Sequence, residues 1–230
     1  MRVTDIKAVA ELAKSAGIMT VVDNTFLTPY FQRPLEQGAE VVIHSGTKYL
    51  GGHNDTLAGF LVVKNENLAE ELKLLQMSSG AILAPFDSWL MLRGIKTLGV
   101  RMEKCQRNAV AIAHWLKNHP KVEKVFYVGL PEHEAYAISR KQAAGSGGMI
   151  SFTVKDAEIV KRILGRVRLI SFAESLGGVE SLITYPLVQT HSAMPKDILE
   201  RLGVNDRLLR LSVGIEAVED LIEDLEQAMG

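Results

Sequence analysis

The chain has 230 residues, of which 47% are hydrophobic and 23% are charged, the balance of an ordinary globular protein with one or two domains. Its 26 lysines and arginines are offset by 27 aspartates and glutamates, and this net charge of −1 excludes a broad electrostatic attraction to nucleic acid or acidic membranes. A single cysteine, Cys105, excludes an intrachain disulfide and favours a reducing compartment. Because the sequence contains neither a membrane-length apolar run nor a signal peptide, we expect a cytoplasmic protein.

The first part of the chain alternates helix and strand. Apolar residues at helical spacing predict a helix over residues 4–16, which Gly17 ends. Short apolar runs predict strands at residues 18–22, 40–44 and 58–63. Nearly continuous apolar strands that are separated by helices favour a mostly parallel sheet covered on both faces.

A long helix is predicted next, over residues 86–118. Asp87 is its candidate N-cap, and Pro120 stands just after its end. Gly94 and Gly99 weaken the helix, so the pattern also allows a break there. A helix of this length would suit a bridge between two domains.

The remainder of the chain has an α+β pattern. Strands are predicted at residues 122–128, 148–154, 167–172, 179–185 and 208–213, and helices at 156–165, 195–202 and 217–229. We therefore place a domain boundary near residue 120. Residues 1–120 would form an α/β domain that ends in the bridging helix, and residues 121–230 would form a smaller α+β domain.

Polar residues stand where two of the predicted strands end. Asp23 ends one strand and Lys48 follows the next, which would place both at the same edge of an open α/β sheet. A carboxylate and a lysine there fit pyridoxal 5'-phosphate (PLP), whose aldehyde is linked to a lysine amine and whose ring nitrogen stays protonated. Ser45 and Thr47 could then donate hydrogen bonds to the phosphate. As alternatives, a loop lysine is commonly a solvated charge, and Asp23 could simply cap a helix.

Other chemistry is poorly supported by the motifs. Residues 46–49 lack the first glycine, and the serine or threonine after the lysine, that a nucleotide-binding P-loop requires. Residues 145–148 enter a strand rather than a helix, so they are not a dinucleotide fingerprint. The six histidines show no metal-ligand spacing, and we expect no metal site.

Several segments together resemble a known family. In chain order they are residues 21–26 (VVDNTF), 44–53 (HSGTKYLGGH), 93–98 (RGIKTL), 174–181 (ESLGGVES), 189–191 (QTH) and 210–216 (RLSVGIE). They resemble the Cys/Met-metabolism PLP enzymes, which include cystathionine γ-synthase, γ-lyase and β-lyase and methionine γ-lyase. The resemblance implies an aminotransferase-like fold of type I, with an incomplete, mostly parallel large-domain sheet and a C-terminal α+β domain. His191 matches the family without an evident chemical task.

The resemblance also implies how the cofactor is held. Lys48 would be linked covalently to PLP and, once displaced by substrate, would carry protons between substrate carbons. Asp23 would pair with the pyridine nitrogen, and Ser45 and Thr47 would hold the phosphate.

For the substrate, the resemblance implies that Arg210, with help from Ser175, binds the α-carboxylate, a task that suits a planar guanidinium. Glu174 lies in the segment that most resembles the γ-synthase and γ-lyase branches, and we include it among the substrate-binding residues. Two simpler interpretations stay open. Arg210 could pair with a structural carboxylate, and Ser175 could satisfy backbone groups in a glycine-rich turn.

The implied function is that of a PLP-dependent transsulfuration enzyme of cysteine and methionine metabolism. It would act by γ-replacement or elimination on homoserine-derived substrates or cystathionine, with cystathionine β-lyase, O-acetylhomoserine thiolyase and methionine γ-lyase as alternatives. Family members carry a long upstream region that this chain lacks. A hypothesis of another class is therefore an inactive fragment or subunit that needs a complementing N-terminal region. The family also implies a homo-oligomer, either a dimer or a tetramer.

Overall fold

The computed structural model of the chain describes residues 1–189 and 192–230, so His191 lies outside the described residues. The chain forms two compact units. The N-terminal unit consists of Arg2–Gly99 and Ala135–Ser146, and the C-terminal unit consists of Met1, Val100–Glu134 and Gly147–Gly230. The domain boundary near residue 120 stays a prediction.

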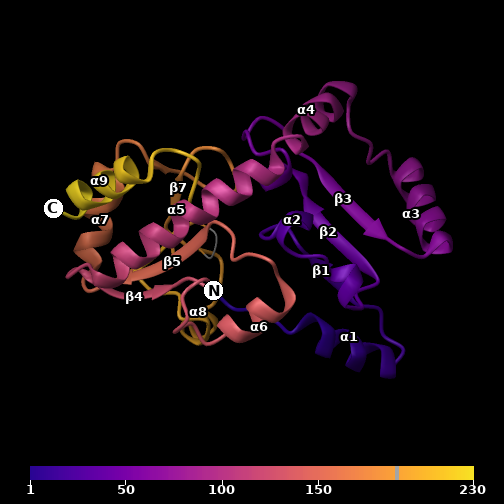
Figure 1. Cartoon of the computed structure of the whole chain (residues 1–230), viewed down its shortest axis with the longest axis horizontal. Helices are drawn as coiled ribbons and strands as arrows, with labels where there is room; N and C mark the ends of the chain where they lie inside the picture. Colours follow the sequence, from indigo (N-terminus) through magenta and orange to yellow (C-terminus); the bar gives the residue numbers. More distant parts are fainter. Residues whose placement is uncertain (190–191) are drawn as a thin grey trace. The chain divides into compact units, whose positions relative to one another are not determined.

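The N-terminal unit is built on a three-stranded sheet of order β1-β2-β3 (Figure 1). Its strands are β1 (Val21–Asp23), β2 (Val41–Ser45) and β3 (Gly59–Val63). The β1–β2 pair is parallel and the β2–β3 pair is antiparallel, so this sheet is mixed. The remaining elements of the unit are α1 (Ile6–Ser15), α2 (Thr28–Phe31), the short turns η1 (Pro34–Gln37) and η2 (Gly46–Leu50), α3 (Glu66–Ser79), α4 (Pro85–Ile95) and α6 (Tyr136–Gln142).

The predicted long helix is broken into two. α4 ends at Ile95 and α5 (Leu98–Asn118) begins three residues later. Thr97 stabilises the break, because its amide and its hydroxyl both donate to the Gly94 carbonyl, at 3.2 and 3.1 Å. The N-cap prediction for Asp87 is wrong, because the cap is Ala84 and Asp87 lies in the first turn of α4. The Asp87 carboxylate instead accepts the hydroxyl of Thr56, at 2.9 Å.

The C-terminal unit contains a five-stranded sheet of order β4-β5-β8-β7-β6. Its strands are β4 (Val122–Phe126), β5 (Met149–Val154), β6 (Ser171–Phe172), β7 (Leu182–Thr184) and β8 (Leu208–Ser212). Side chains of Ile150, Leu211 and Ile183 form a fully buried cross-strand row. This row shares one hydrophobic core with α5, α7 (Ala157–Arg166) and α9 (Val218–Met229), which Figure 1 shows beside the sheet.

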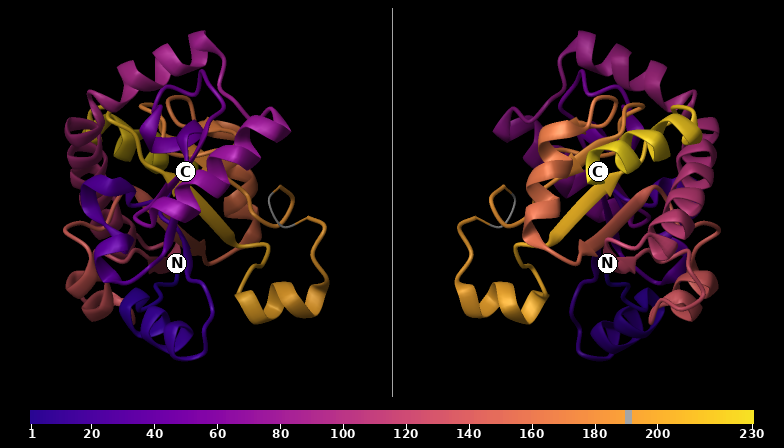
Figure 2. Two further views of the ribbon diagram at one scale, coloured as in Figure 1. Left: turned by 90° about the vertical axis from the view of Figure 1, so that its right-hand side faces the viewer. Right: turned by 90° about the vertical axis from the view of Figure 1, so that its left-hand side faces the viewer.

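Strands β6 and β7 are both shorter than the predicted runs, and for β6 the reason is specific. The amides of Arg168, Leu169 and Ile170 donate to the carboxylate of Asp224 on α9, at 2.8 to 2.9 Å. Those three donors are therefore not available to a strand ladder. Helix α8 (Lys196–Leu202) also belongs to this unit and lies away from the sheet (Figure 2). In the described parts of the chain, no helix combines the length and apolar character needed to cross a membrane.

Candidate functional site

The ends of β1 and β2 form the first half of the candidate site. Because the strands are parallel, with Asp23 opposite Ile43, their carboxyl ends meet at one edge of the sheet. Two hydrogen bonds join the segments that follow. The Asn24 amide donates to the Ile43 carbonyl at 2.8 Å, and the Ser45 amide donates to the Thr25 hydroxyl at 2.8 Å. Asp23 and Ser45 are thereby brought to the same edge of the sheet.

Lys48 lies in the turn η2, directly after β2. This turn has the wide hydrogen-bonding pattern of a π-helix, and Lys48 itself departs from helical geometry, with φ −94° and ψ −131°. The neighbouring side chains Tyr49 and Leu50 are buried and anchor the turn. Short π-helical segments are frequent at functional sites, although the amino-acid pattern of residues 46–50 does not reveal one.

The hydroxyl of Thr47 ties this turn to Ala58, the residue directly before β3. It accepts a hydrogen bond from the Ala58 amide at 3.1 Å and donates to the Ala58 carbonyl at 3.4 Å. The donor bond is long, so the hydroxyl proton could be redirected to a phosphate oxygen at little cost.

Asp23 is exposed, and its carboxylate accepts the Thr25 amide at 2.9 Å. It does not cap α2, whose N-cap is Leu27. The neighbouring His44 ring is buried, and burial lowers its pKa more than the nearby Asp23 charge raises it. At neutral pH the ring is therefore uncharged, and it leaves the Asp23 charge available to a cationic group of a ligand.

These four side chains suit three functional groups of PLP. A carboxylate suits the protonated ring nitrogen, two hydroxyls suit the phosphate, and an amine suits the aldehyde. All four come from one sheet edge of the N-terminal unit. The donor set therefore fits the cofactor that the sequence predicted.

The second set of predicted residues belongs to the C-terminal unit. In the cross-strand row of Ser151, Arg210 and Thr184, the Arg210 side chain lies on the sheet face opposite the buried row. Its Nη2 donates to the Ser175 carbonyl at 3.5 Å and to the Thr184 hydroxyl at 3.4 Å. Ser175 has a φ of +99°, a strained value for a residue other than glycine and one that is often found at functional sites. Glu174 is exposed.

A polar network joins the segment that follows β8 to the segment that precedes β7, and sequence reasoning missed it. The Glu216 carboxylate accepts the amide and the hydroxyl of Ser181, at 2.5 and 2.9 Å. The same hydroxyl accepts the Gly214 amide at 2.9 Å, and Asn108 donates to the Gly214 and Glu216 carbonyls, at 3.0 and 2.9 Å. A Cβ on Gly214 would lie 2.2 Å from the Val179 carbonyl oxygen. Ser181 and Glu216 lie inside two of the family-like segments, residues 174–181 and 210–216, and that resemblance was the signal available in the sequence.

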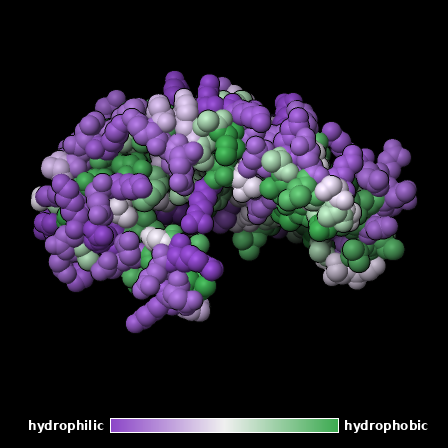
Figure 3. All heavy atoms as spheres, turned by 90° about the horizontal axis from the view of Figure 1, so that it is seen from below, coloured by the Kyte–Doolittle hydropathy of each residue, from purple (hydrophilic) through white to green (hydrophobic). Residues whose placement is uncertain are grey.

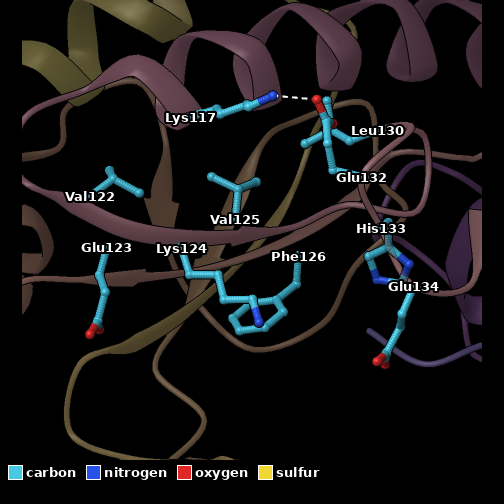
Figure 4. Close-up of a pocket in the computed structure, with 10 residues that line it drawn as sticks. All are labelled: Lys117, Val122, Glu123, Lys124, Val125, Phe126, Leu130, Glu132, His133 and Glu134. Carbon is cyan, nitrogen blue, oxygen red and sulfur yellow. Dashed lines mark hydrogen bonds and ion pairs between the residues drawn. The ribbon is translucent and has the colours of Figure 1, made fainter.

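A separate cavity of about 360 Å³ lies beside β4 (Figure 4). Its walls contain an ion pair between Lys117 and Glu132, at 2.5 Å, and a Lys124 ammonium 5.0 Å from the centre of the Phe126 ring. Lys117 and Glu132 pair with one another on side chains that are 43% and 62% exposed, and no predicted site residue lines the cavity. We therefore do not regard it as the active site. Among the described residues, no group of three or more His, Cys, Asp or Glu side chains could hold a metal ion.

Residues 1–230 match the sequence profile of the family described as Cys/Met metabolism PLP-dependent enzyme. The chain is 50% identical over 229 residues to cystathionine γ-lyase of Bacillus subtilis (strain 168) and 51% identical over 231 residues to cystathionine β-lyase of Coxiella burnetii. Both alignments cover 100% of this chain and 60% of the relative, so the chain spans only that share of their length. Its structure matches cystathionine γ-synthase from Xanthomonas oryzae pv. oryzae in complex with cystathionine with a TM-score of 0.96, at 44% identity, over 99% of this chain and 59% of the other.

Proposed function

Because the chain belongs to the Cys/Met metabolism PLP-dependent enzymes, we propose that it supplies the cofactor lysine and the substrate-binding arginine of a transsulfuration enzyme. The observation that carries the proposal is the common sheet edge from which Asp23, Ser45, Thr47 and Lys48 come. Relatives that act on cystathionine by name support the substrate class.

On this proposal, four residues hold PLP, which when bound supplies an electron sink for negative charge developing on the substrate. The Lys48 amine holds the aldehyde carbon and, when released, moves protons at Nζ. The Asp23 carboxylate keeps the ring nitrogen protonated, because an adjacent negative charge favours the charged form of a base. The hydroxyls of Ser45 and Thr47 donate to the phosphate.

The proposal assigns Arg210 to the α-carboxylate of the substrate, through two parallel N–H donors. Its contacts with the Ser175 carbonyl and the Thr184 hydroxyl would hold the guanidinium in one orientation. A fixed carboxylate determines which bond at Cα is aligned for cleavage. Ser175 would assist Arg210, and Glu174 would face the distal part of the substrate.

The proposed reaction is γ-replacement or elimination on cystathionine or an activated homoserine. Breaking the Cγ–S bond of cystathionine yields cysteine, whereas breaking the Cβ–S bond yields homocysteine, so the products separate γ-lyase from β-lyase activity. O-acetylhomoserine thiolyase and methionine γ-lyase activities are the further alternatives. The segment at residues 174–181, with Glu174 and the glycine pair, favours the γ-synthase and γ-lyase branches.

We further propose that the protein acts in the cytoplasm as a homo-oligomer, a dimer or a tetramer. The single cysteine in 230 residues supports a reducing compartment. Large apolar side chains that are more than half exposed, such as Phe86, Trp89 and Leu92, support association between chains.

Titration of the chain with PLP, followed by visible absorbance, tests the cofactor proposal. Covalent attachment at Lys48 predicts a protein-bound absorbance band that Lys48→Ala abolishes. The matched control is Lys64→Ala, which removes an exposed lysine of the same unit and should leave the band unchanged. Equal bands in wild type and Lys48→Ala would refute the assignment.

Product analysis with cystathionine tests the substrate proposal. Release of cysteine would identify a γ-lyase and release of homocysteine a β-lyase. If the chain binds PLP but turns nothing over, the same assay is repeated after adding the upstream region of a relative as a separate polypeptide. Restored turnover would support the alternative of a subunit that needs a complementing region, an alternative motivated by the 60% coverage of the relatives.

A further inference from the structure

Helix α4 approaches the Lys48 turn more closely than any side chain would allow. A Cβ placed on Gly94 would lie 2.4 Å from the Gly51 carbonyl oxygen and 3.1 Å from the Gly51 Cα. Both neighbours are backbone atoms, so they cannot rotate away as the end of a flexible side chain could. A glycine at position 94 is therefore required by the packing of α4 on the residue that follows η2, and not by helix propensity, which disfavours it.

The Gly51 peptide group is itself fixed to the turn that carries Lys48. Its carbonyl lies 2.8 Å from Nδ1 of His53, which can donate to it, and its amide donates to the Gly46 carbonyl at 2.9 Å. The next amide, of Gly52, donates to the Lys48 carbonyl at 2.7 Å. Any displacement of Gly51 is thus transmitted to both ends of η2 and to the Lys48 backbone.

The start of the turn is packed just as closely. A Cβ on Gly46 would lie 2.6 Å from the Phe60 ring on β3 and 3.0 Å from the terminal methyl of Met91 on α4. Met91 is also close to Gly51, since its sulfur would lie 3.3 Å from a Cβ there. The Lys48 turn is therefore clamped between β3 on one side and α4 on the other.

We propose that Gly94 is a positioning residue for Lys48, acting through Gly51. The inference rests on the proposed function, in which Lys48 holds the cofactor. A methyl group at position 94 would push the Gly51 carbonyl away from His53 and shift η2, so that the lysine amine no longer meets a cofactor held by Asp23 and the Ser45 hydroxyl, which lie outside the turn. The segment at residues 93–98, which the cofactor assignment left without a task, gains one.

The test compares Gly94→Ala with wild type by two measurements. The first, made without cofactor, is amide hydrogen exchange at Gly51 and Gly52, which should become at least about tenfold faster. The second is the share of PLP label at Lys48 relative to other lysines after borohydride reduction, recorded at a series of pH values. In the variant this share should fall on the order of tenfold to a hundredfold. The control is Gly165→Ala inside α7, where a Cβ meets nothing within 4 Å and neither measurement should change.

A second pair of variants keeps the proposal testable if Gly94→Ala does not fold. Met91→Ala removes the α4 contact with the turn without introducing a clash, and it should also speed exchange at Gly51 and Gly52. Leu92→Ala is its matched control, because Leu92 lies on the same helix and is 66% exposed. If Met91→Ala leaves exchange unchanged in that case, the clamp is refuted.

The two proposals fail in distinguishable ways. If wild type shows no preferential label at Lys48, the proposed function fails, while the exchange measurement still decides whether α4 fixes the turn. If Gly94→Ala matches wild type in both exchange and labelling, Gly94 does not position Lys48.

Discussion

At the scale of single residues, Cys105 gives the chain a measurable dependence on pH. The thiol is 1% exposed, and burial raises its pKa from 9.0 to about 12. Between these values the unfolded chain releases the thiol proton and the folded chain retains it. The free energy of unfolding should therefore fall as pH rises through this window, by about 1.4 kcal/mol per pH unit.

Urea unfolding at a series of alkaline pH values checks this, with Cys105→Ala as the comparison. In the variant, the slope of the free energy of unfolding against pH should lack the contribution of one proton. Its absolute stability should also drop, because the substitution leaves a cavity. Tyr127, whose pKa burial also raises, is present in both proteins, so the difference in slope isolates the thiol. Identical slopes would contradict a buried, neutral Cys105.

Arg210 gives a second prediction at this scale. Arg210→Lys keeps the positive charge but loses the planar pair of donors, so KM for an amino-acid substrate should rise by about tenfold or more. PLP labelling of Lys48 should not change, because Arg210 is assigned to the substrate alone. Steady-state kinetics of the active holoenzyme measure the first quantity and peptide mapping the second. A loss of Lys48 labelling would instead indicate that Arg210 serves the cofactor.

Residues at strand ends were predictable, whereas residues that act through close packing were not. Asp23 and Lys48 are recognisable because each follows a short apolar run, and parallel strands bring such positions to one edge. Gly94 carries no comparable signal, since only the folded chain places it against Gly51. The N-cap prediction for Asp87 failed because Pro85 takes the first helical position and Thr56 binds the carboxylate.

At the scale of elements, Asp224 connects α9 to the segment before β6. Its carboxylate accepts three backbone amides and the Gln227 side chain. Asp224→Ala should lower the free energy of unfolding by about 2 to 4 kcal/mol, because buried donors lose a charged acceptor. Glu223→Ala, an exposed carboxylate on the same helix, should change it by less than about 0.5 kcal/mol. Equal effects in urea unfolding would contradict this account.

Helices with a one-sided apolar pattern were predictable, and a helix without one was not. α9 and α7 have apolar faces that enter the core, as their sequences indicate. α3 was missed, and none of its residues, all of which the structure describes, is buried. Its limits come from local chemistry, since Asn65 caps its start and Gly80, at φ +71°, ends it.

At the scale of the whole molecule, the N-terminal unit exposes much apolar surface. Leu74, Leu75 and Met77 on α3 are more than 60% exposed, as are Phe86 and Leu92 on α4. Figure 3 shows apolar atoms gathered on the face of this unit, at the right, that is seen from below. Exposed apolar surface of this extent is typical of interaction sites.

We predict concentration-dependent association of the purified chain, measured by sedimentation velocity. Phe86→Lys combined with Leu92→Lys should shift the protein toward the 25.3 kDa monomer, because charge opposes burial at an interface. Leu169→Lys, on the C-terminal unit, is the control and should leave association unchanged. A single monomeric species of the unaltered chain at every concentration would contradict the prediction.

The order of elements along the chain was largely predictable, but the return of a later segment to the N-terminal unit was not. Residues 135–146 join the N-terminal unit. Gln142 accepts the Ile6 amide at 3.2 Å, donates to the Thr4 carbonyl at 3.0 Å and, through its own carbonyl, accepts Gln37 at 2.8 Å. Long-range polar contacts of this kind leave no periodic trace in a sequence.

The central claim is that Lys48 is the cofactor lysine, and reductive trapping tests it most directly. The chain is mixed with PLP, reduced with borohydride, digested, and mapped by mass spectrometry. The account predicts one label per chain, confined to the peptide that contains Lys48 and sharply reduced in Asp23→Ala. Label spread evenly over many lysines, with no preference for Lys48, would contradict it.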